Sequence, residues 1–296
     1  MHRFIIILTI LTLAITACGG QPASPAGTVA PVILTSTSFL ADITRNIAGD
    51  RQTVATLLPL GADPHSYQPT PQDVTTITQS KVLIINGADY EHFLEPILEN
   101  AGGEREVVDA SAGITPREEA GSVDPHIWLD PNNVIVYVEN IREALTHFDP
   151  AGAAVYQANA EAYGTELKSL DAWIVEQVNQ IPAEKRLLVT NHEAFGYFAA
   201  RYGFTIAGTV IESFSSDASP SAQQMAALID QIKASGAPAI FLDAADNTTF
   251  AQQIADETGV RVVTDLHLES LTDGAPAATY IDMMKNNVTQ IVNALK

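Results

Sequence analysis

One segment near the middle of the chain most limits the folds that are open to it. No proline lies between Pro150 and Pro182. Apolar side chains recur there at steps of three and four residues: Tyr156, Ala160, Tyr163, Leu167, Leu170, Trp173, Ile174 and Val178. This spacing predicts one amphipathic helix over residues 149–181, roughly 45 Å long at about 1.5 Å per residue. A helix of that length is stiff, so we expect it to join two separate parts of the fold.

Short apolar runs alternate with helical patterns on both sides of this segment. Before it, the expected strands are Val32–Thr35, Val54–Leu58, Val82–Ile85 and Glu106–Asp109, with helices near residues 38–48, 71–80 and 91–101. After it, the expected strands are Arg186–Thr190, Thr205–Thr209, Ala239–Asp243 and Val260–Thr264, with helices near residues 194–202, 220–235, 247–258 and 277–295. Such alternation predicts mostly parallel sheets covered by helices. We therefore expect two α/β lobes, at residues 32–148 and 182–296, joined by the helix.

The N-terminus has the layout of a cleaved secretory signal. A short basic start precedes an apolar stretch at residues 4–17, which is shorter than the roughly 20 residues that span a bilayer. Cys18, the only cysteine, follows directly, in an arrangement similar to a bacterial lipobox. The alternative is a plain secreted protein with an incidental cysteine. We expect residues 1–17 to be removed, Cys18 to be lipidated, and residues 18–31 to form a flexible tether. The chain would then be exported and anchored to the cell membrane, facing the periplasm or the cell exterior.

The excess of acidic over basic residues limits which kinds of molecule the protein is expected to bind. The chain carries 35 acidic and 15 basic residues, a formal net charge of −20. Such an excess argues against nucleic acid as a partner and favours the approach of cations. The same excess would also keep an exported protein soluble, so it does not by itself predict cation binding.

Three histidines lie at junctions between apolar runs and turns. They are His65 in Gly-Ala-Asp-Pro-His-Ser, His126 in Asp-Pro-His-Ile-Trp, and His192 in Thr-Asn-His-Glu-Ala. Asp-Pro-His is also ordinary turn chemistry, so one such histidine alone is weak evidence. In open α/β sheets, however, ligands bind beyond the carboxyl ends of the strands, and neutral imidazole is a common zinc ligand. Together the three histidines predict one metal site in the cleft between the lobes.

A tetrahedral site needs a fourth ligand, and the end of the last strand offers candidates. Asp265, His267 and Glu269 alternate there and would share one face if the strand continued. Glu269 is the first choice and Asp265 the alternative, while His267 has the setting of an exposed loop residue. The other histidines have weaker settings, and His92 and His147 fall on expected helices and not at strand ends.

The ordered set of motifs resembles the zinc/manganese-type solute-binding lipoproteins of ABC transporters. It comprises the lipobox, residues 61–73, 124–131 and 191–198, Ser-Pro-Ser at 219–221, and Glu-Ser-Leu at 269–271. The resemblance implies two α/β lobes joined by a rigid helix, with a metal held between them for delivery to a membrane permease. It places the ligands at His65, His126, His192 and Glu269. Glutamate replaces the family's more frequent aspartate and the preceding segment is about one residue short, so Asp265 remains open. We expect a monomer.

The expected cargo is Zn²⁺, with Mn²⁺ as the alternative. Three imidazoles and one carboxylate suit zinc, whereas manganese prefers more oxygen ligands. The histidine-rich loop of some zinc-specific relatives is missing from residues 101–123. A shell of four protein ligands leaves no position for an activated water, which predicts binding and not catalysis.

Two functions of other classes remain alternatives. One is a lipid-anchored zinc hydrolase with Glu193 or Glu269 as general base. Against it, Gly196 stands where a His-Glu-x-x-His motif needs its second histidine. The other is a surface adhesin.

Overall fold

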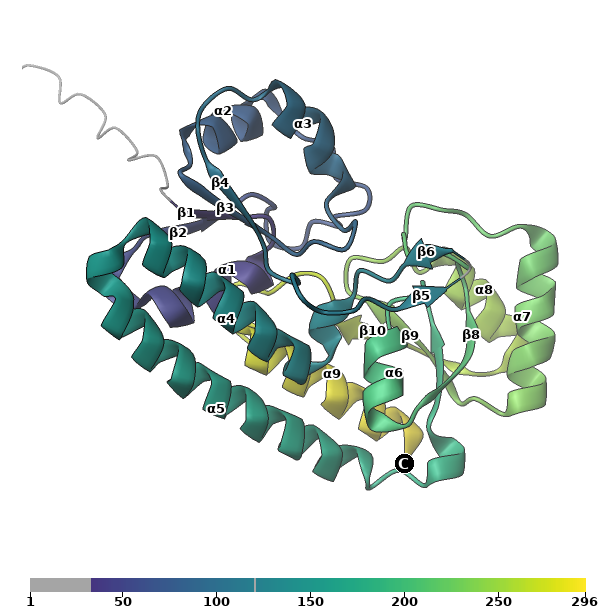
Figure 1. Cartoon of the computed structure of the whole chain (residues 1–296). Helices are drawn as coiled ribbons and strands as arrows, with labels where there is room; N and C mark the ends of the chain where they lie inside the picture. The colour runs from purple at the N-terminus through teal and green to yellow at the C-terminus, as the bar shows by residue number, and fades with distance from the viewer. Residues whose placement is uncertain (1–32, 120) are drawn as a thin grey trace, which may run out of the picture.

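The computed structural model describes residues 33–119 and 121–296, so the expected signal segment, Cys18 and the tether lie outside the described residues. Two lobes lie side by side, each built on a four-stranded parallel sheet, and long helices run beneath both (Figure 1). The two-lobe α/β fold is confirmed. Within the described residues, no helix is both long enough and apolar enough to cross a membrane.

The first lobe contains a sheet of strand order β2-β1-β3-β4. Its strands are β1 (Ile33–Thr35), β2 (Val54–Thr56), β3 (Val82–Ile85) and β4 (Glu106–Asp109). Its helices are α1 (Ser38–Ala48), α2 (Pro71–Gln79) and α3 (Glu95–Asn100), with 3₁₀ turns at Gly49–Arg51 and His92–Leu94. The strand expected to reach Leu58 ends at Thr56, where its paired register with β1 ends at Thr35; beyond it, the N–H groups of Leu57 and Leu58 still donate to the Thr35 and Ser36 carbonyls.

One helix of this lobe differs from its expected extent. The helix expected at 91–101 is divided into a 3₁₀ turn and α3. Pro96 lies in the first turn of α3. Proline has no N–H and fits there but would disrupt a helix interior.

The second lobe contains a sheet of strand order β10-β9-β7-β8. Its strands are β7 (Leu187–Thr190), β8 (Thr205–Thr209), β9 (Ala239–Asp243) and β10 (Arg261–Leu266). Its helices are α6 (Gly196–Tyr202), α7 (Ala222–Ser235) and α8 (Thr249–Thr258), and a 3₁₀ turn covers Ala183–Lys185. Helix α7 begins where Ser221 and Gln224 cap each other's backbone N–H groups and ends at Gly236, which adopts a left-handed conformation. These local signals explain why its predicted bounds agree closely with the structure.

The linking helix is α5 (Ala153–Val178), which has 26 residues. At about 1.5 Å per residue it is roughly 39 Å long, shorter than the predicted 149–181 because a 3₁₀ turn, Pro150–Gly152, precedes it. Most of the predicted apolar stripe is buried, and Trp173 is half-buried. The stripe packs between α4 (Pro131–Phe148) and α9 (Tyr280–Leu295) (Figure 1).

The last part of the chain returns from the second lobe to the first. The Tyr280 hydroxyl donates to the Trp128 carbonyl at 2.6 Å, and the Tyr280 N–H donates to Asp42 Oδ2 at 2.9 Å. Helix α9 therefore packs against α1 and α5, and one hydrophobic core continues beneath both lobes. A short hairpin, β5 (Glu118–Glu119) and β6 (Ser122–Val123), extends toward the second lobe (Figure 1). The lobes are thus joined by more than the linking helix.

Candidate metal centre

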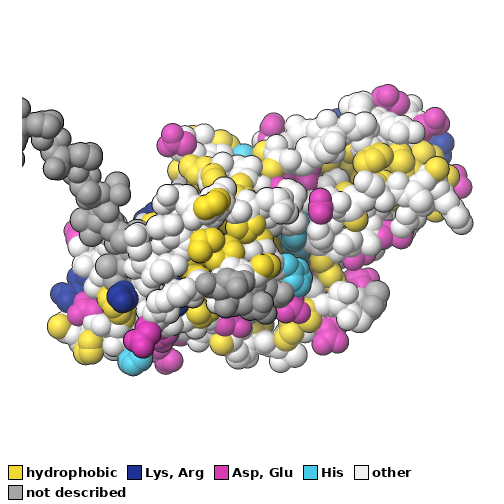
Figure 2. All heavy atoms as spheres, turned by 90° about the horizontal axis from the view of Figure 1, so that it is seen from above, with side chains coloured by type: hydrophobic (Ala, Val, Ile, Leu, Met, Phe, Trp, Pro, Cys, Tyr) yellow, Lys and Arg dark blue, Asp and Glu magenta, His cyan; other side chains and the backbone are white. Residues whose placement is uncertain are grey.

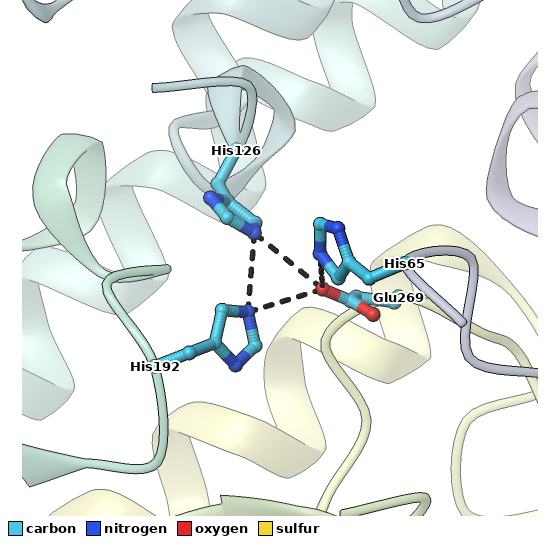
Figure 3. Close-up of side chains that lie close together, drawn as sticks. All are labelled: His65, His126, His192 and Glu269. Atoms are coloured by element: carbon cyan, nitrogen blue, oxygen red, sulfur yellow. Dashed lines mark hydrogen bonds and ion pairs between the residues drawn. The ribbon is translucent and has the colours of Figure 1, made fainter. Parts of the chain in front are cut away.

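Four side chains from four separate segments meet between the lobes: His65, His126, His192 and Glu269. One nitrogen or oxygen atom from each lies within 4.8 Å of the corresponding atoms of the others. Figure 3 shows the three imidazole rings arranged around the carboxylate of Glu269. The structure therefore brings together all four residues that the sequence singled out as first choices.

The same local turn presents two of the histidines. In each Asp-Pro-His sequence the aspartate side chain accepts the histidine N–H, from His65 to Asp63 Oδ1 at 2.9 Å and from His126 to Asp124 Oδ1 at 3.0 Å. An aspartate that bonds the backbone two residues on stabilises a tight turn. Proline between them restricts the backbone further. The repeated motif thus has a structural role that directs each imidazole toward the cleft.

Asp124 also orients the ring that it presents. His126 Nδ1 lies 3.0 Å from Asp124 Oδ1, so this nitrogen carries the proton and donates. That tautomer leaves Nε2, the atom that faces the other three side chains, free to accept a proton or a metal. Sequence analysis did not assign this role to Asp124, although the Asp-Pro-His spacing contained the signal.

The other two side chains come from the second lobe's sheet. His192 follows β7, and its own carbonyl accepts a hydrogen bond from the Thr190 hydroxyl at 2.9 Å. Glu269 follows β10 by three residues. Both therefore lie beyond the carboxyl ends of parallel strands, as expected for a ligand site in an α/β sheet.

The alternative fourth ligand, Asp265, lies outside the group. Asp265, His267 and Glu269 were expected to share one face only if the strand continued, and it does not, because β10 ends at Leu266. The Asn287 side chain bonds both backbone groups of His267: its Oδ1 accepts the His267 N–H at 2.8 Å, and its Nδ2 donates to the His267 carbonyl at 2.6 Å. Asp265 is exposed and His267 half-buried, whereas Glu269 is only 7% exposed.

The distances match the edges of a small coordination shell. Glu269 Oε1 lies 2.9 Å from His65 Nε2 and 3.2 Å from His192 Nε2. The same oxygen lies 3.4 Å from His126 Nε2, and the Nε2 atoms of His126 and His192 are 3.2 Å apart. Bonds of about 2.0–2.1 Å in a tetrahedron give edges of roughly 3.3 Å. Four of the six edges are thus close to those of a tetrahedral shell, and all four donor atoms lie within 4.8 Å of one another, which is near enough for a single ion.

The electrostatics of the group suit a cation. Burial favours the neutral form of Glu269, but the charge of His65 and hydrogen bonds from the three histidines outweigh it and hold the pKa of Glu269 well below its usual value. Burial also opposes charge on His126, yet its bonds to Asp124 and Glu269 raise the pKa of His126 to about 9. For His192 burial dominates and lowers the pKa. The group holds a carboxylate and one readily protonated imidazole, whose proton a metal would displace.

The centre is buried, but His65 borders an acidic hollow of about 510 Å³ between the lobes. Four carboxylate residues contribute to its wall: Asp89, Glu119, Glu193 and Glu212. Figure 2 shows acidic side chains spread widely over this face and few basic ones. Glu193, a candidate base in the hydrolase alternative, lines this hollow and does not join the four-residue group. A cation would meet negative charge before it reached the histidines.

This chain is similar to several known metal-binding proteins. A family model described as the periplasmic component A of a zinc-uptake complex matches residues 33–294. The manganese-binding lipoprotein MntA of Halalkalibacterium halodurans is 36% identical, over 99% of this chain and 98% of the relative. The iron-binding protein YfeA of Yersinia pestis is also 36% identical, over 88% and 84%. The solved periplasmic zinc-binding protein TroA of Treponema pallidum is 29% identical, with a TM-score of 0.83 over 90% of this chain and 99% of that one.

Proposed function

This chain belongs to the family of periplasmic zinc-uptake component A proteins, the substrate-binding proteins of metal ABC transporters, and from that premise we propose that its own cargo is Zn²⁺. The ion would be held by His65, His126, His192 and Glu269 and passed to a membrane permease. The similar proteins are named for manganese, iron and zinc, so family membership alone leaves the metal open.

The observation that carries the proposal is the donor set. In a buried site, one carboxylate oxygen lies 2.9–3.4 Å from three imidazole nitrogens, two of those nitrogens are 3.2 Å apart, and all four atoms lie within 4.8 Å of one another. This set and spacing suit four-coordinate zinc, whereas manganese favours more oxygen ligands and a larger coordination number. Manganese remains the second candidate because MntA, a relative that matches almost the whole chain, is named for it.

The mechanism that follows is capture and release. Four protein donors would fill a tetrahedral shell, which leaves no open position for the activated water of a catalytic zinc site. Glu269, the other candidate base of the hydrolase alternative, already has one oxygen beside all three histidines. Neither this geometry nor the relatives support the hydrolase alternative.

We also propose that the protein works outside the cytoplasm, anchored through a lipid on Cys18 and as a monomer. Support comes from the sequence around Cys18 and from the name lipoprotein carried by MntA. Stable anchoring needs about two acyl chains, since one gives only marginal membrane binding.

The direct test is calorimetric titration of residues 32–296, stripped of metal, with zinc and in parallel with manganese. We expect one zinc ion per chain, bound far more tightly than manganese. Equal or tighter binding of manganese would move the cargo to manganese and call for additional oxygen ligands. If neither ion bound, both the assigned ligands and the uptake function would be wrong.

A further inference from the structure

We propose that Asp243, at the end of β9, is the positioning residue through which the second lobe holds Glu269 in the metal site. This inference rests on the proposed function, because it concerns the geometry of one of the proposed ligands. It adds a residue that lies 26 positions before Glu269 in the chain and belongs to none of the motifs described above.

The backbone beside Glu269 is attached to the first lobe on both sides. Before it, the Trp128 indole N–H donates to the Leu268 carbonyl at 2.8 Å. After it, the Ser270 hydroxyl oxygen accepts the Gly61 N–H at 2.7 Å, and the Leu271 N–H donates to the Ser38 hydroxyl at 2.9 Å. Residues 268–271, which follow the last strand of the second lobe, are thus held by the first.

Asp243 supplies the opposing attachment to the second lobe. Its Oδ2 accepts the N–H of Leu268, the residue directly before Glu269, at 2.5 Å. Its Oδ1 accepts the Ala245 N–H at 2.8 Å, which completes a turn at the end of the strand. Each oxygen of this residue, which is only 7% exposed, therefore accepts a backbone N–H.

Burial of the Asp243 carboxylate is energetically unfavourable unless hydrogen bonds stabilise it. Removing a carboxylate from water is strongly unfavourable unless hydrogen bonds compensate. Here the compensating donors include the N–H of Leu268, the residue directly before the proposed ligand Glu269. Asp243 is also held in place, because Asp246 accepts the Asp243 N–H at 2.7 Å and, with its other oxygen, the Asn191 side chain at 2.7 Å. Asn191 directly precedes His192 and Leu268 directly precedes Glu269, so Asp246 and Asp243 each bond the residue before one of the proposed ligands from this lobe.

The consequence is that the position of the Glu269 carboxylate depends on both lobes. Trp128, Gly61 and Ser38 fix it to the first lobe, and Asp243 fixes it to the sheet that also presents His192. A shift of one lobe relative to the other would pull on this short segment. Loss of the Asp243 bonds would leave Glu269 attached to the first lobe alone and free to rotate away from the histidines.

The test is a double-mutant cycle on the full chain, purified in detergent and stripped of metal. Zinc affinity would be measured by competition with a chelating dye for the wild type, Asp243→Asn, Glu269→Gln and the double variant. We expect Asp243→Asn to weaken zinc binding by about 10- to 100-fold, as loss of a ligand's hydrogen-bond partner does. In the Glu269→Gln background, Asp243→Asn should weaken zinc binding by less than about twofold, because Asp243 acts on the metal through Glu269. An equal loss in both backgrounds, or no loss in the wild type, would overturn the proposal.

Two further variants separate position from charge. Asp243→Glu keeps the charge but moves the carboxylate by one methylene, so we expect it to weaken zinc binding as well. Wild-type affinity in Asp243→Glu would show that charge alone matters and would contradict a positioning role. Asp230→Asn removes an exposed carboxylate on α7, and its affinity should equal that of the wild type.

A spectroscopic measurement distinguishes a change at the metal site from a general loss of structure. Co²⁺ bound to the wild type should show the strong visible absorption of a four-coordinate ion, and Asp243→Asn should shift that spectrum in the direction that Glu269→Gln does. An Asp243→Asn spectrum identical to the wild type's would contradict the proposal. Failure of the wild type to bind zinc would instead contradict the proposed function, and with it any role for Asp243 in supporting zinc binding.

Discussion

Ser216 of the second lobe and Asp63 of the first are hydrogen-bonded across the cleft, with the serine hydroxyl donating to Asp63 Oδ2 at 2.8 Å. The other oxygen of Asp63 accepts the His65 N–H at 2.9 Å. A loop of one lobe thus contacts the turn that presents a proposed ligand from the other. This contact should help to keep the cleft closed over a bound ion.

Substitution of Ser216 by alanine should therefore accelerate metal release. Loss of one such bond costs about 1 kcal/mol, which corresponds to roughly a fivefold faster dissociation. Stopped-flow mixing of the zinc-loaded protein with a chelator would measure this rate. Ser215→Ala is the matched control, because the Ser215 hydroxyl accepts only the Asp217 N–H within the same loop. Equal zinc dissociation rates for the two variants would show that the Ser216–Asp63 hydrogen bond does not slow metal release.

His126→Ala should weaken zinc binding by well over 100-fold. It would remove a donor that is fully buried at the centre of the group, and loss of even a ligand's partner typically costs 10- to 100-fold. His147→Ala is the control, since that side chain is 79% exposed on α4 and bonds to Glu106. Dye competition on both variants would measure the difference. Retention of near-wild-type affinity by His126→Ala would exclude His126 as a ligand.

Zinc affinity should fall as the pH is lowered. Despite burial, bonds to Asp124 and Glu269 raise the pKa of His126 to about 9, so below that pH the ion must displace one proton. Between pH 7 and 8.5 the association constant should rise about tenfold per pH unit. The dependence can be followed by dye competition in a pH series. An affinity unchanged between pH 5.5 and 7.5 would contradict the histidine-rich shell.

The same series on Asp124→Asn tests the cause of this pH dependence. Without the carboxylate beside Nδ1, the pKa of His126 should fall, and the steep region should move to lower pH. An unchanged profile would show that Asp124 does not control the proton on His126.

Buried Glu91 should make the metal-free protein less stable as the pH rises. Burial outweighs its bonds from Ser36, Asn86 and Gly87 and raises the pKa of Glu91 from 4.5 to about 7. The folded state therefore binds more protons than the unfolded state in this range. The stabilising contribution is complete below pH 4.5 and is lost as the pH rises through 7, a change of about 3 kcal/mol.

Denaturant unfolding of the wild type and Glu91→Gln between pH 4 and 8 would measure this effect. The free energy of unfolding of the wild type, relative to that of the variant, should decrease with rising pH. Glu104→Gln, at an exposed position, should show no comparable trend. Parallel curves for the wild type and Glu91→Gln would contradict the prediction.

Cys18→Ala should release the exported protein from the membrane. If the lipid on Cys18 is the anchor, the variant has no acyl chains to bury in the bilayer and should remain in the soluble fraction. Cell fractionation with an antibody against the second lobe would detect the change. Persistent membrane association of the variant would require a different anchor.

The sequence by itself determined the local elements and the turns that carry the histidines. Strands Thr205–Thr209 and Ala239–Asp243 have their predicted bounds, because short apolar runs and flanking turn residues act over a few positions. The Asp-Pro-His turns depend on a bond between residues two apart. Spacing of this kind can be read directly along the chain.

Only the tertiary structure decided which acidic residue joins the histidines and how the lobes are tied together. Glu269 and His65 are 204 positions apart. Strand β10 contains Asp265 but ends at Leu266, before it could reach Glu269, and Asn287 from α9 binds the backbone of the next residue, His267. The contacts of Asp243 with Leu268 and of Ser216 with Asp63 likewise join distant segments. Local sequence patterns do not predict such contacts between distant residues. The contacts form only when the sheets and helices pack together and bring the ends of separate strands to one place.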